Sequence, residues 1–192
     1  DPCRSRGLGD VYKRQSLLGG EKISVVRADS TCVDSAVATA VAEGVVAQGV
    51  VAIMGADCPG VTSAIASDVA VPHGVVMISP SAPSPVLTTL DDNGYFFRTA
   101  PSDARGGQIL ADITNDRKVK SVAITYTNND YGKSLADVYK AAVEAYGIKV
   151  TAVNAHEDGK VDYSSEVATL ALAGGDAVVV IGYHDQGGKG II

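Results

Sequence analysis

A short apolar run that ends abruptly in prolines and serines constrains the fold of this chain more than any other feature. Residues 75–78 (Val-Val-Met-Ile) are followed at 79–85 by Ser-Pro-Ser-Ala-Pro-Ser-Pro. Four consecutive apolar residues predict a strand buried on both faces, as in a parallel sheet. Because proline lacks an amide hydrogen, neither strand nor helix continues through the second segment. Small polar groups are therefore expected at the carboxyl end of a parallel strand, where open α/β sheets bind ligands.

The rest of the chain alternates predicted strands with predicted helices. The apolar patterns predict strands at 22–28, 50–55, 75–78, 121–126, 149–153 and 177–181. They predict helices at 33–48, 61–71, 102–115, 131–146 and 163–173. Ser102 is a good N-cap, and Gly49 and Gly147 are expected to end helices. Repeated βα units indicate an α/β fold with parallel sheets and right-handed crossovers. The pattern alone fits either two lobes joined near 99–101 or one doubly wound domain of flavodoxin type.

Both ends of the sequence differ from the middle. Residues 1–15 lack apolar periodicity and are rich in basic residues, so we expect a non-native or disordered tail there. The last six residues begin what resembles another helix, which indicates a fragment truncated at both ends. We expect a partial N-terminal lobe at 16–100 and a partial C-terminal lobe at 101–192.

The charge balance argues against nucleic acid as a partner. The net charge is −6, whereas phosphate binding needs clustered Lys and Arg. The basic cluster at 117–120 lies between a predicted helix and a predicted strand and is interpreted as a solvated turn. No apolar run approaches the roughly 20 residues that cross a bilayer, so the chain is not expected to span a membrane.

Several motifs together resemble a known family. After the segment at 75–85 and an Asn93-Gly94 turn, residues 96–103 read Phe-Phe-Arg-Thr-Ala-Pro-Ser-Asp. This resembles the substrate-binding proteins of ABC importers for branched-chain amino acids, the Leu/Ile/Val-binding type, whose pattern is close to I-S-P-S-A-T-S-P-x-L-T followed by F-R-T-x-P-S-D. The resemblance runs from about Lys22 to the last residue.

The resemblance carries expectations about fold and function. It implies the type I periplasmic-binding-protein fold, a two-lobed clamshell of parallel doubly wound sheets that holds a small solute, most simply a branched-chain amino acid, between its lobes. It also implies a periplasmic location and ABC permease subunits as partners. The sequence has neither a complete phosphate-binding loop nor a G-x-S-x-G motif, so no enzymatic activity and no cofactor are expected. The alternative is a receptor or regulator of the same fold that senses an amide or another small molecule.

Two segments of the first lobe carry the expected ligand contacts. The loop at 55–62 enters a helix, whose free amide hydrogens favour an anion such as a carboxylate. It is similar to the family's C-S-G-x-T, with Pro59 at the Ser that contacts the ligand, followed by Gly60 and Thr62. Residues 81–83 match the family's S-A-T, with Pro83 at the Thr position. The expected ligand-binding residues of this lobe are Pro59, Gly60, Thr62, Ser81, Ala82 and Pro83.

The two prolines weaken the usual recognition of a zwitterion, because they supply neither a hydroxyl nor an amide hydrogen at these positions. We therefore expect either a carboxylate site that uses the Gly60 amide and the Thr62 hydroxyl, or an amide-type solute. The family also uses an acidic residue for the ligand's ammonium group, and the resemblance implies that its position lies beyond Ile192.

The second lobe supplies two tyrosines. Residues 129–132 match the family's N-D-Y-G, whose tyrosine closes over the ligand, and this places Tyr131 in the site. Tyr183 follows the strand at 177–181 and matches a second tyrosine of the family. A tyrosine ring covers apolar surface while its hydroxyl completes a hydrogen bond, so both residues suit a ligand clamp.

Cysteine and histidine complete the sequence-based expectations. Cys32 and Cys58 are predicted near one sheet edge, and the resemblance implies a disulfide between them; free thiols are the alternative. The three histidines show no zinc-type spacing and are expected at the surface, so no metal site is predicted. Acidic residues at loops and helix entries, namely Asp57, Asp103 and Asp130, are interpreted as caps before they are considered as catalytic groups.

Overall fold

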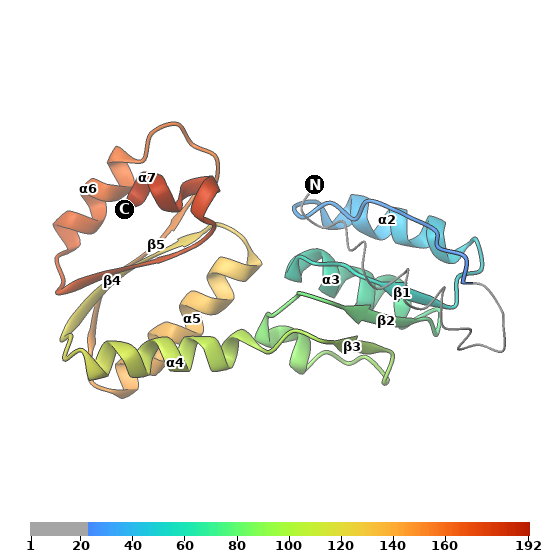
Figure 1. The fold of residues 1–192 in the computed structure, drawn as a ribbon, viewed down its shortest axis with the longest axis horizontal. Helices are drawn as coiled ribbons and strands as arrows, with labels where there is room; N and C mark the ends of the chain where they lie inside the picture. Colours follow the sequence, from blue (N-terminus) through green and yellow to red (C-terminus); the bar gives the residue numbers. More distant parts are fainter. Residues whose placement is uncertain (1–22) are drawn as a thin grey trace.

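Two separate parallel sheets organise the protein. The structure is a computed structural model that describes residues 23–192. One three-stranded sheet has the order β1-β2-β3 and the other has the order β5-β4-β6, and every strand pair is parallel. The sheets lie in two lobes that follow one another along the chain (Figure 1). The expected tail at 1–15 and Lys22 lie outside the described residues.

The first lobe packs two helices on one face of its sheet. Its elements are α2 (Ser35–Val46), β1 (Ala52–Met54), α3 (Pro59–Ile65), the π-helical turn η1 (Ala66–Ala70), β2 (Val76–Ser79), the 3-10 turn η2 (Pro85–Thr88) and β3 (Phe96–Arg98). Met77 is fully buried at the centre of the sheet. It packs with apolar residues of α2 and α3, such as Ala38 and Val61. The loops that follow β1 and β2 are thereby fixed at one edge of the sheet.

The second lobe has helices on both faces of its sheet. Its elements are α4 (Asp103–Asp116), β4 (Ser121–Thr127), α5 (Asp130–Ala145), β5 (Lys149–His156), α6 (Ser164–Ala173), β6 (Ala177–Ile181), the π-helical turn η3 (His184–Gly188) and α7 (Lys189–Ile191). Figure 1 shows α4 and α5 below the sheet and α6 and α7 above it. The central strand β4 is buried on both faces, since Val122 and Ile124 pack toward α4 and α5 while Ala123 packs toward α6.

These observations confirm the α/β, two-lobed fold class. Two sheets with separate cores exclude the single sheet of flavodoxin type. The cap expectations are also confirmed: the Ser102 hydroxyl accepts a hydrogen bond from the amide of Ala104 at the start of α4. Gly49 and Gly147 follow α2 and α5 with φ of 78° and 73°. Only glycine adopts this left-handed conformation without steric cost, which is why both helices end there.

One predicted strand does not form, and one observed strand lies outside the predicted ranges. Residues 23–28 form no strand, and the side chains of Ile23, Val25 and Val26 are exposed. An apolar pattern predicts which residues could pair but not whether a neighbouring strand is available, and β1 has only three residues. Conversely, residues 96–98 form β3, which pairs with β2. Its three residues are too few to show a period.

The first sheet presents an apolar outer face. Met54, Ile78 and Phe97 lie side by side across the three strands. They are 64%, 40% and 53% exposed. Along each strand the neighbouring residue points into the core, so the alternation is that of a sheet covered on one face only. Within residues 23–192, no helix is long and apolar enough to cross a membrane.

Candidate functional site: a ligand-binding site between strand-end loops

One backbone carbonyl ties together the two strand-end loops of the first lobe. Thr62 donates a hydrogen bond from its hydroxyl to the carbonyl oxygen of Ala56 over 3.0 Å, and Ser79 donates to the same oxygen over 2.5 Å. The amide of Ala82 in turn donates to the Ser79 hydroxyl over 3.1 Å. Thr62, Ser79 and Ala82 are all fully buried. The loop after β1, the start of α3 and the loop after β2 therefore form one rigid unit.

This network decides which predicted residues remain free to bind a ligand. The Thr62 hydroxyl donates to Ala56, and its amide donates to the Cys58 carbonyl over 2.9 Å. Thr62 thus positions the loop. Pro59 is buried as the first residue of α3, and Cys58 contributes no side-chain cap. Because amide groups in the first turn of a helix lack intrahelical partners, the Gly60 amide is the group of this segment that suits a ligand.

Arg98 holds the loop at 81–85 in place through hydrogen bonds. One guanidinium nitrogen of Arg98 donates to the Ser84 carbonyl over 2.6 Å, and another donates to the Thr88 hydroxyl over 2.5 Å. Ser81 is exposed, with its hydroxyl 3.4 Å from the Asp57 carbonyl. The Pro83 carbonyl accepts the amide of Asp103 over 2.9 Å. Of the three predicted residues here, Ser81 is exposed, Ala82 is buried and Pro83 anchors the start of α4.

Tyr131 and Tyr183 lie together in the second lobe, as expected for residues of one site. Their rings stack with centroids 5.5 Å apart and an angle of 28° between their planes. Tyr131 is in the first turn of α5, which Asn129 caps by accepting the Gly132 amide over 2.9 Å. Tyr183 directly precedes η3 and is 39% exposed. The stacked rings give an aromatic surface at the ends of β4 and β6.

The environment keeps both phenols protonated. Burial raises the pKa of Tyr131, and the negative charge of Asp103 and the neighbouring Tyr183 raise it further. Burial also raises the pKa of Tyr183, and the side chain of Asn129 opposes this effect in part. Both hydroxyls are consequently available as hydrogen-bond donors at neutral pH.

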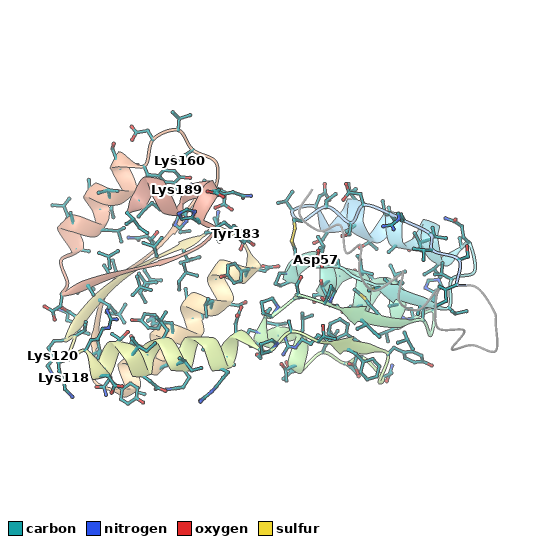
Figure 2. The ribbon with its side chains drawn as sticks, in the orientation of Figure 1. Asp57, Lys118, Lys120, Lys160, Tyr183 and Lys189 are labelled. Atoms are coloured by element: carbon teal, nitrogen blue, oxygen red, sulfur yellow. A yellow bond between two sulfur atoms is a disulfide. The ribbon has the colours of Figure 1, made fainter. Side chains whose placement is uncertain are left out.

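The strand-end loops of the two lobes face each other. Figure 2 shows Asp57 and Tyr183 on the sides of the two lobes that are turned toward one another. The Ser84 and Ser134 hydroxyls are 3.3 Å apart across this boundary. Gly60 lies so close to Asp130 that a Cβ atom at position 60 would overlap its carboxylate. The predicted residues of both lobes are thus brought to one boundary.

Asp103 is a site candidate that sequence reasoning treated as a cap. Ser102 caps α4, and Asp103 is the first helical residue. One of its carboxylate oxygens is buried and has no hydrogen-bond partner in the described part of the chain. Burial raises the pKa of Asp103, and the positive charge of Arg98 partly offsets this effect. The negative charge of Asp103 in turn raises the pKa of Tyr131. An unpaired carboxylate close to the aromatic surface is suited to an ammonium group. Asp130 likewise begins a helix capped by its predecessor, and the cap expectation is wrong for both residues.

The structure shows how Cys32 and Cys58 pair and which histidines are buried. Cys32 and Cys58 form a disulfide with a Cα separation of 5.3 Å. His73 and His184 are exposed, whereas His156 is only 2% exposed. The expectation of three surface histidines is therefore wrong for His156, because β5 extends three residues beyond the predicted Val153 and carries this side chain into the lobe. Residues 23–192 contain no group of three or more metal-ligating side chains.

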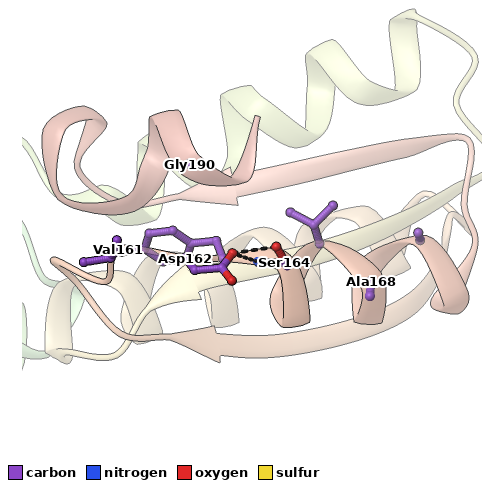
Figure 3. Close-up of a pocket in the computed structure, with 8 residues that line it drawn as sticks. Val161, Asp162, Ser164, Ala168 and Gly190 are labelled. Carbon is purple, nitrogen blue, oxygen red and sulfur yellow. Dashed lines mark hydrogen bonds between the residues drawn. The ribbon is translucent and has the colours of Figure 1, made fainter.

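Two hollows lie away from these loops. One of about 400 Å³ is lined by residues 161–164, by one face of α6 and by Gly190. Figure 3 shows that Asp162 accepts two hydrogen bonds from Ser164 at the start of this helix. The other hollow, of about 390 Å³, lies between α2 and α3. Neither includes a predicted ligand-binding residue, and both are lined mainly by small or apolar side chains.

Two lobes of parallel α/β structure whose strand-end loops face each other define a ligand-binding protein of the type I periplasmic-binding-protein fold. The chain belongs to the family described as the receptor family ligand binding region, which matches residues 8–190. This assignment agrees with the resemblance found in the sequence motifs.

Curated proteins with similar sequences are named as amino-acid-binding proteins. The chain is 32% identical over 180 residues to the Leu/Ile/Val-binding protein homolog 3 of Brucella melitensis, covering 93% of this chain and 48% of that protein. It is 31% identical over 187 residues to the Leu/Ile/Val-binding protein of Escherichia coli, covering 96% and 49%. The chain thus spans about half the length of the curated relatives it matches.

Solved structures agree with the fold. The branched-chain amino acid transporter substrate binding protein LivJ from Streptococcus pneumoniae, in complex with isoleucine, superimposes with a TM-score of 0.73 at 29% identity, covering 86% of this chain and 47% of that one. The leucine binding protein LivK from Thermotoga maritima gives a TM-score of 0.76 at 23% identity, covering 86% and 47%. The second likeness concerns the fold alone.

Proposed function

We propose that this chain is part of the substrate-binding component of an ABC importer, which captures an amino acid of branched-chain type between its lobes in the periplasm and delivers it to permease subunits. The observation that carries the proposal is the stacked pair Tyr131 and Tyr183 on one lobe, opposite the rigid loops of the other. Relatives named as Leu/Ile/Val-binding proteins support the ligand class.

The polar groups at the boundary suit the two ends of an amino acid. The carboxylate is proposed to meet the amide of Gly60 and the exposed Ser81, and the ammonium group is proposed to meet Asp103. An apolar side chain would lie on the aromatic surface, where tyrosine offers contact area at little entropic cost. A ligand that contacts both lobes only when they are close together drives closure by its differential affinity for that state.

One observation favours a second candidate, an amide-sensing receptor of the same fold. Pro59 and Pro83 supply no donor, and the Thr62 hydroxyl donates to Ala56. Each lost hydrogen bond to a charged group costs about 1.5–3 kcal/mol. Two such losses correspond to about two to four orders of magnitude in affinity for a carboxylate. An uncharged amide would lose less.

Calorimetric titration of the full-length protein with leucine, isoleucine, valine and the corresponding amides tests the proposal. Tyr131→Ala and Tyr183→Ala should each weaken binding by about tenfold or more, as expected for a central aromatic residue of an interface. Tyr146→Ala is the matched control, because Tyr146 is 46% exposed at the far end of α5. It should leave the affinity unchanged.

The outcomes separate the candidates. Saturable binding of an amino acid that depends on both tyrosines, together with recovery of the protein in the osmotic-shock fraction, supports the importer component. Binding of amides alone supports the sensor. If no member of either series binds, or if the three tyrosine variants behave alike, the proposed site is wrong.

A further inference from the structure

His156 is a buried titratable residue that the proposed ligand contacts do not include. It ends β5 with 2% of its surface exposed. Its Nδ1 atom lies 2.8 Å from the hydroxyl of Thr125 on β4, whereas its Nε2 atom is buried and has no hydrogen-bond partner within residues 23–192. Most buried polar atoms in folded proteins have such a partner, so the unpaired Nε2 calls for an explanation.

The His156 ring lies against the segment that carries Tyr183. A Cβ atom placed on Gly182 would be 3.1 Å from Nε2, and one placed on Gly187 would be 3.4 Å from Cδ2. Two glycines, one on each side of residues 183–186, thus let the backbone approach the imidazole closely. A displacement of the His156 ring toward this segment would therefore push against Gly182, the residue that precedes Tyr183.

The backbone of His156 also supports the second tyrosine. Its carbonyl accepts the amide of Asn128 over 2.9 Å. The next residue, Asn129, caps the helix that begins with Asp130 and Tyr131. A single residue at the end of β5 therefore contacts the segments that lead to both rings of the stacked pair.

The turn after Tyr183 is tied to the loop that follows His156. The carbonyl of Gln186 accepts the amide of Gly159 over 2.6 Å and lies 2.8 Å from the hydroxyl of Tyr163. The same hydroxyl lies 2.9 Å from the Glu157 carbonyl. The Tyr163 ring meets the His156 ring edge-on, with centroids 6.3 Å apart.

The charged groups around His156 come from the 157–160 loop, α6 and η3. Burial lowers the pKa of His156, and the carboxylates of Asp158, Glu166 and Glu157 oppose this effect in that order. Glu166 is paired with Lys160. Asp158 has one buried carboxylate oxygen without a partner. On η3 and α7, the side chains of His184, Asp185 and Lys189 pair with one another and are 71%, 79% and 63% exposed.

We propose that His156 is a positioning residue for the tyrosine pair, and that its neutral form holds the Tyr183 segment in the ligand-binding arrangement while its protonated form loosens it. This inference rests on the proposed function, because it concerns regulation of the same site. Ligand is held at neutral pH and held less tightly in acid.

The physical basis is the hydrogen-bonding capacity of the imidazole. When the ring takes up a proton, both nitrogens become donors. In the tautomer whose Nδ1–H donates to the Thr125 hydroxyl, Nε2 carries no hydrogen, and protonation adds one at Nε2, for which residues 23–192 supply no hydrogen-bond partner. A buried unpaired donor, particularly a charged one, is costly. Pairing with Asp158 instead would shift the loop that Tyr163 ties to η3. Both routes displace the segment that bears Tyr183.

The test measures ligand affinity of the full-length protein from pH 7.5 to pH 5.0 with the amino acid or amide found to bind. The wild-type affinity should fall about tenfold, which corresponds to a difference of one pKa unit between the bound and free states. His156→Gln retains a polar side chain and does not titrate, so its affinity should vary less than about twofold. His184→Gln, the exposed control, should keep the wild-type profile.

A measurement without ligand separates this inference from the proposed function. The protection factors of residues 182–188, which correct for the slower intrinsic exchange in acid, should decrease as the pH falls to 5.0 in wild type and in His184→Gln but not in His156→Gln. If no ligand binds and exchange behaves as expected, the proposed function fails and the positioning role stands.

An NMR titration of the three histidines in the wild type covers the case in which His156→Gln does not fold. Because burial lowers the pKa of His156, its ring should titrate below the ordinary histidine range, and the shifts of residues 182–188 should follow the His156 titration. If those shifts do not follow His156, if His156→Gln keeps the wild-type pH profile, or if exchange does not depend on position 156, the inference is overturned.

Discussion

Removal of the Ser79 hydroxyl tests whether the strand-end loops of the first lobe are held by the shared Ala56 carbonyl. Ser79→Ala removes the donor 2.5 Å from that carbonyl and also the acceptor of the Ala82 amide. Ala82 is fully buried, so its amide cannot turn to water. A lost hydrogen bond costs about 1 kcal/mol, and a buried unpaired donor costs about 1–3 kcal/mol. We therefore expect the free energy of unfolding to fall by about 2–4 kcal/mol.

Thr62→Val makes the prediction sharper, because it removes only the second donor to the same carbonyl. Ser79 still satisfies that oxygen, so this substitution should cost only about 1 kcal/mol. The double variant leaves the carbonyl unpaired and should be less stable than the sum of the single variants by about 1 kcal/mol, within the range found for groups that share a partner.

Urea unfolding followed by circular dichroism gives the energies, and hydrogen exchange of the Ala82 amide gives the local effect. Ser81→Ala is the control, because Ser81 is exposed and its hydroxyl is 3.4 Å from its carbonyl partner. It should change stability by no more than about 0.5 kcal/mol. Equal effects of Ser79→Ala and Ser81→Ala, or strict additivity of Ser79→Ala and Thr62→Val, would refute the shared-carbonyl network.

Three further predictions concern other parts of the fold. The Cys32–Cys58 disulfide spans a sequence separation of 26, so replacing both cysteines with alanine should lower the free energy of unfolding by about 3.5 kcal/mol; urea melts with no loss would contradict this. Gly132→Ala would press a methyl group against Thr127 and should lower the free energy of unfolding by about 1–3 kcal/mol. Gly44→Ala, in open space within α2, should instead raise it by about 0.5–1 kcal/mol. Thermal melts in which both variants behave alike would count against the close approach of Gly132 to Thr127. Because burial raises the pKa of Asp103, its ionised form opposes folding, so Asp103→Asn should raise the melting temperature at pH 7 and weaken amino-acid binding. The gain in stability should vanish as the pH falls toward the ordinary aspartate pKa of about 3.9. A lower melting temperature at pH 7 would contradict the burial argument.

The sequence predicts the repeating parts of this fold better than its irregular parts. Helices with a clear apolar stripe and defined ends, such as α4 and α5, lie within one residue of their predicted bounds at each end. The strand at Ala177–Ile181 has the predicted bounds. In contrast, β3 has only three residues, and its pairing with β2 depends on contacts distant in sequence. The exposed stretch at 23–28 fails for the opposite reason, since apolar alternation does not supply a neighbouring strand.

In the candidate site, too, some features can be predicted from the sequence and others depend on tertiary structure. Strand-end position and motif assign Tyr131 and Tyr183 to one site, and the two rings stack in the structure; their contact with a ligand stays a prediction. The motif cannot reveal that the Thr62 hydroxyl donates to a backbone carbonyl, or that Ser79 rather than Ser81 is the buried organiser. Nor can it reveal that His156 is buried against Gly182, because a histidine next to an acidic loop residue gives no signal of burial. A buried hydrogen bond between distant residues depends on tertiary structure.

The Ala56 carbonyl network separates the residues that shape the loops from those that would meet a ligand. Thr62, Ser79 and Ala82 hold the backbone through atoms that point into the lobe. Pro59 and Pro83 stand beside them and contribute nothing to that network through their side chains. Under the proposed function, substitutions at 59 and 83 would alter which solute is preferred while the loop path persists. A protein built this way would acquire a new ligand through changes at two positions without first losing its fold.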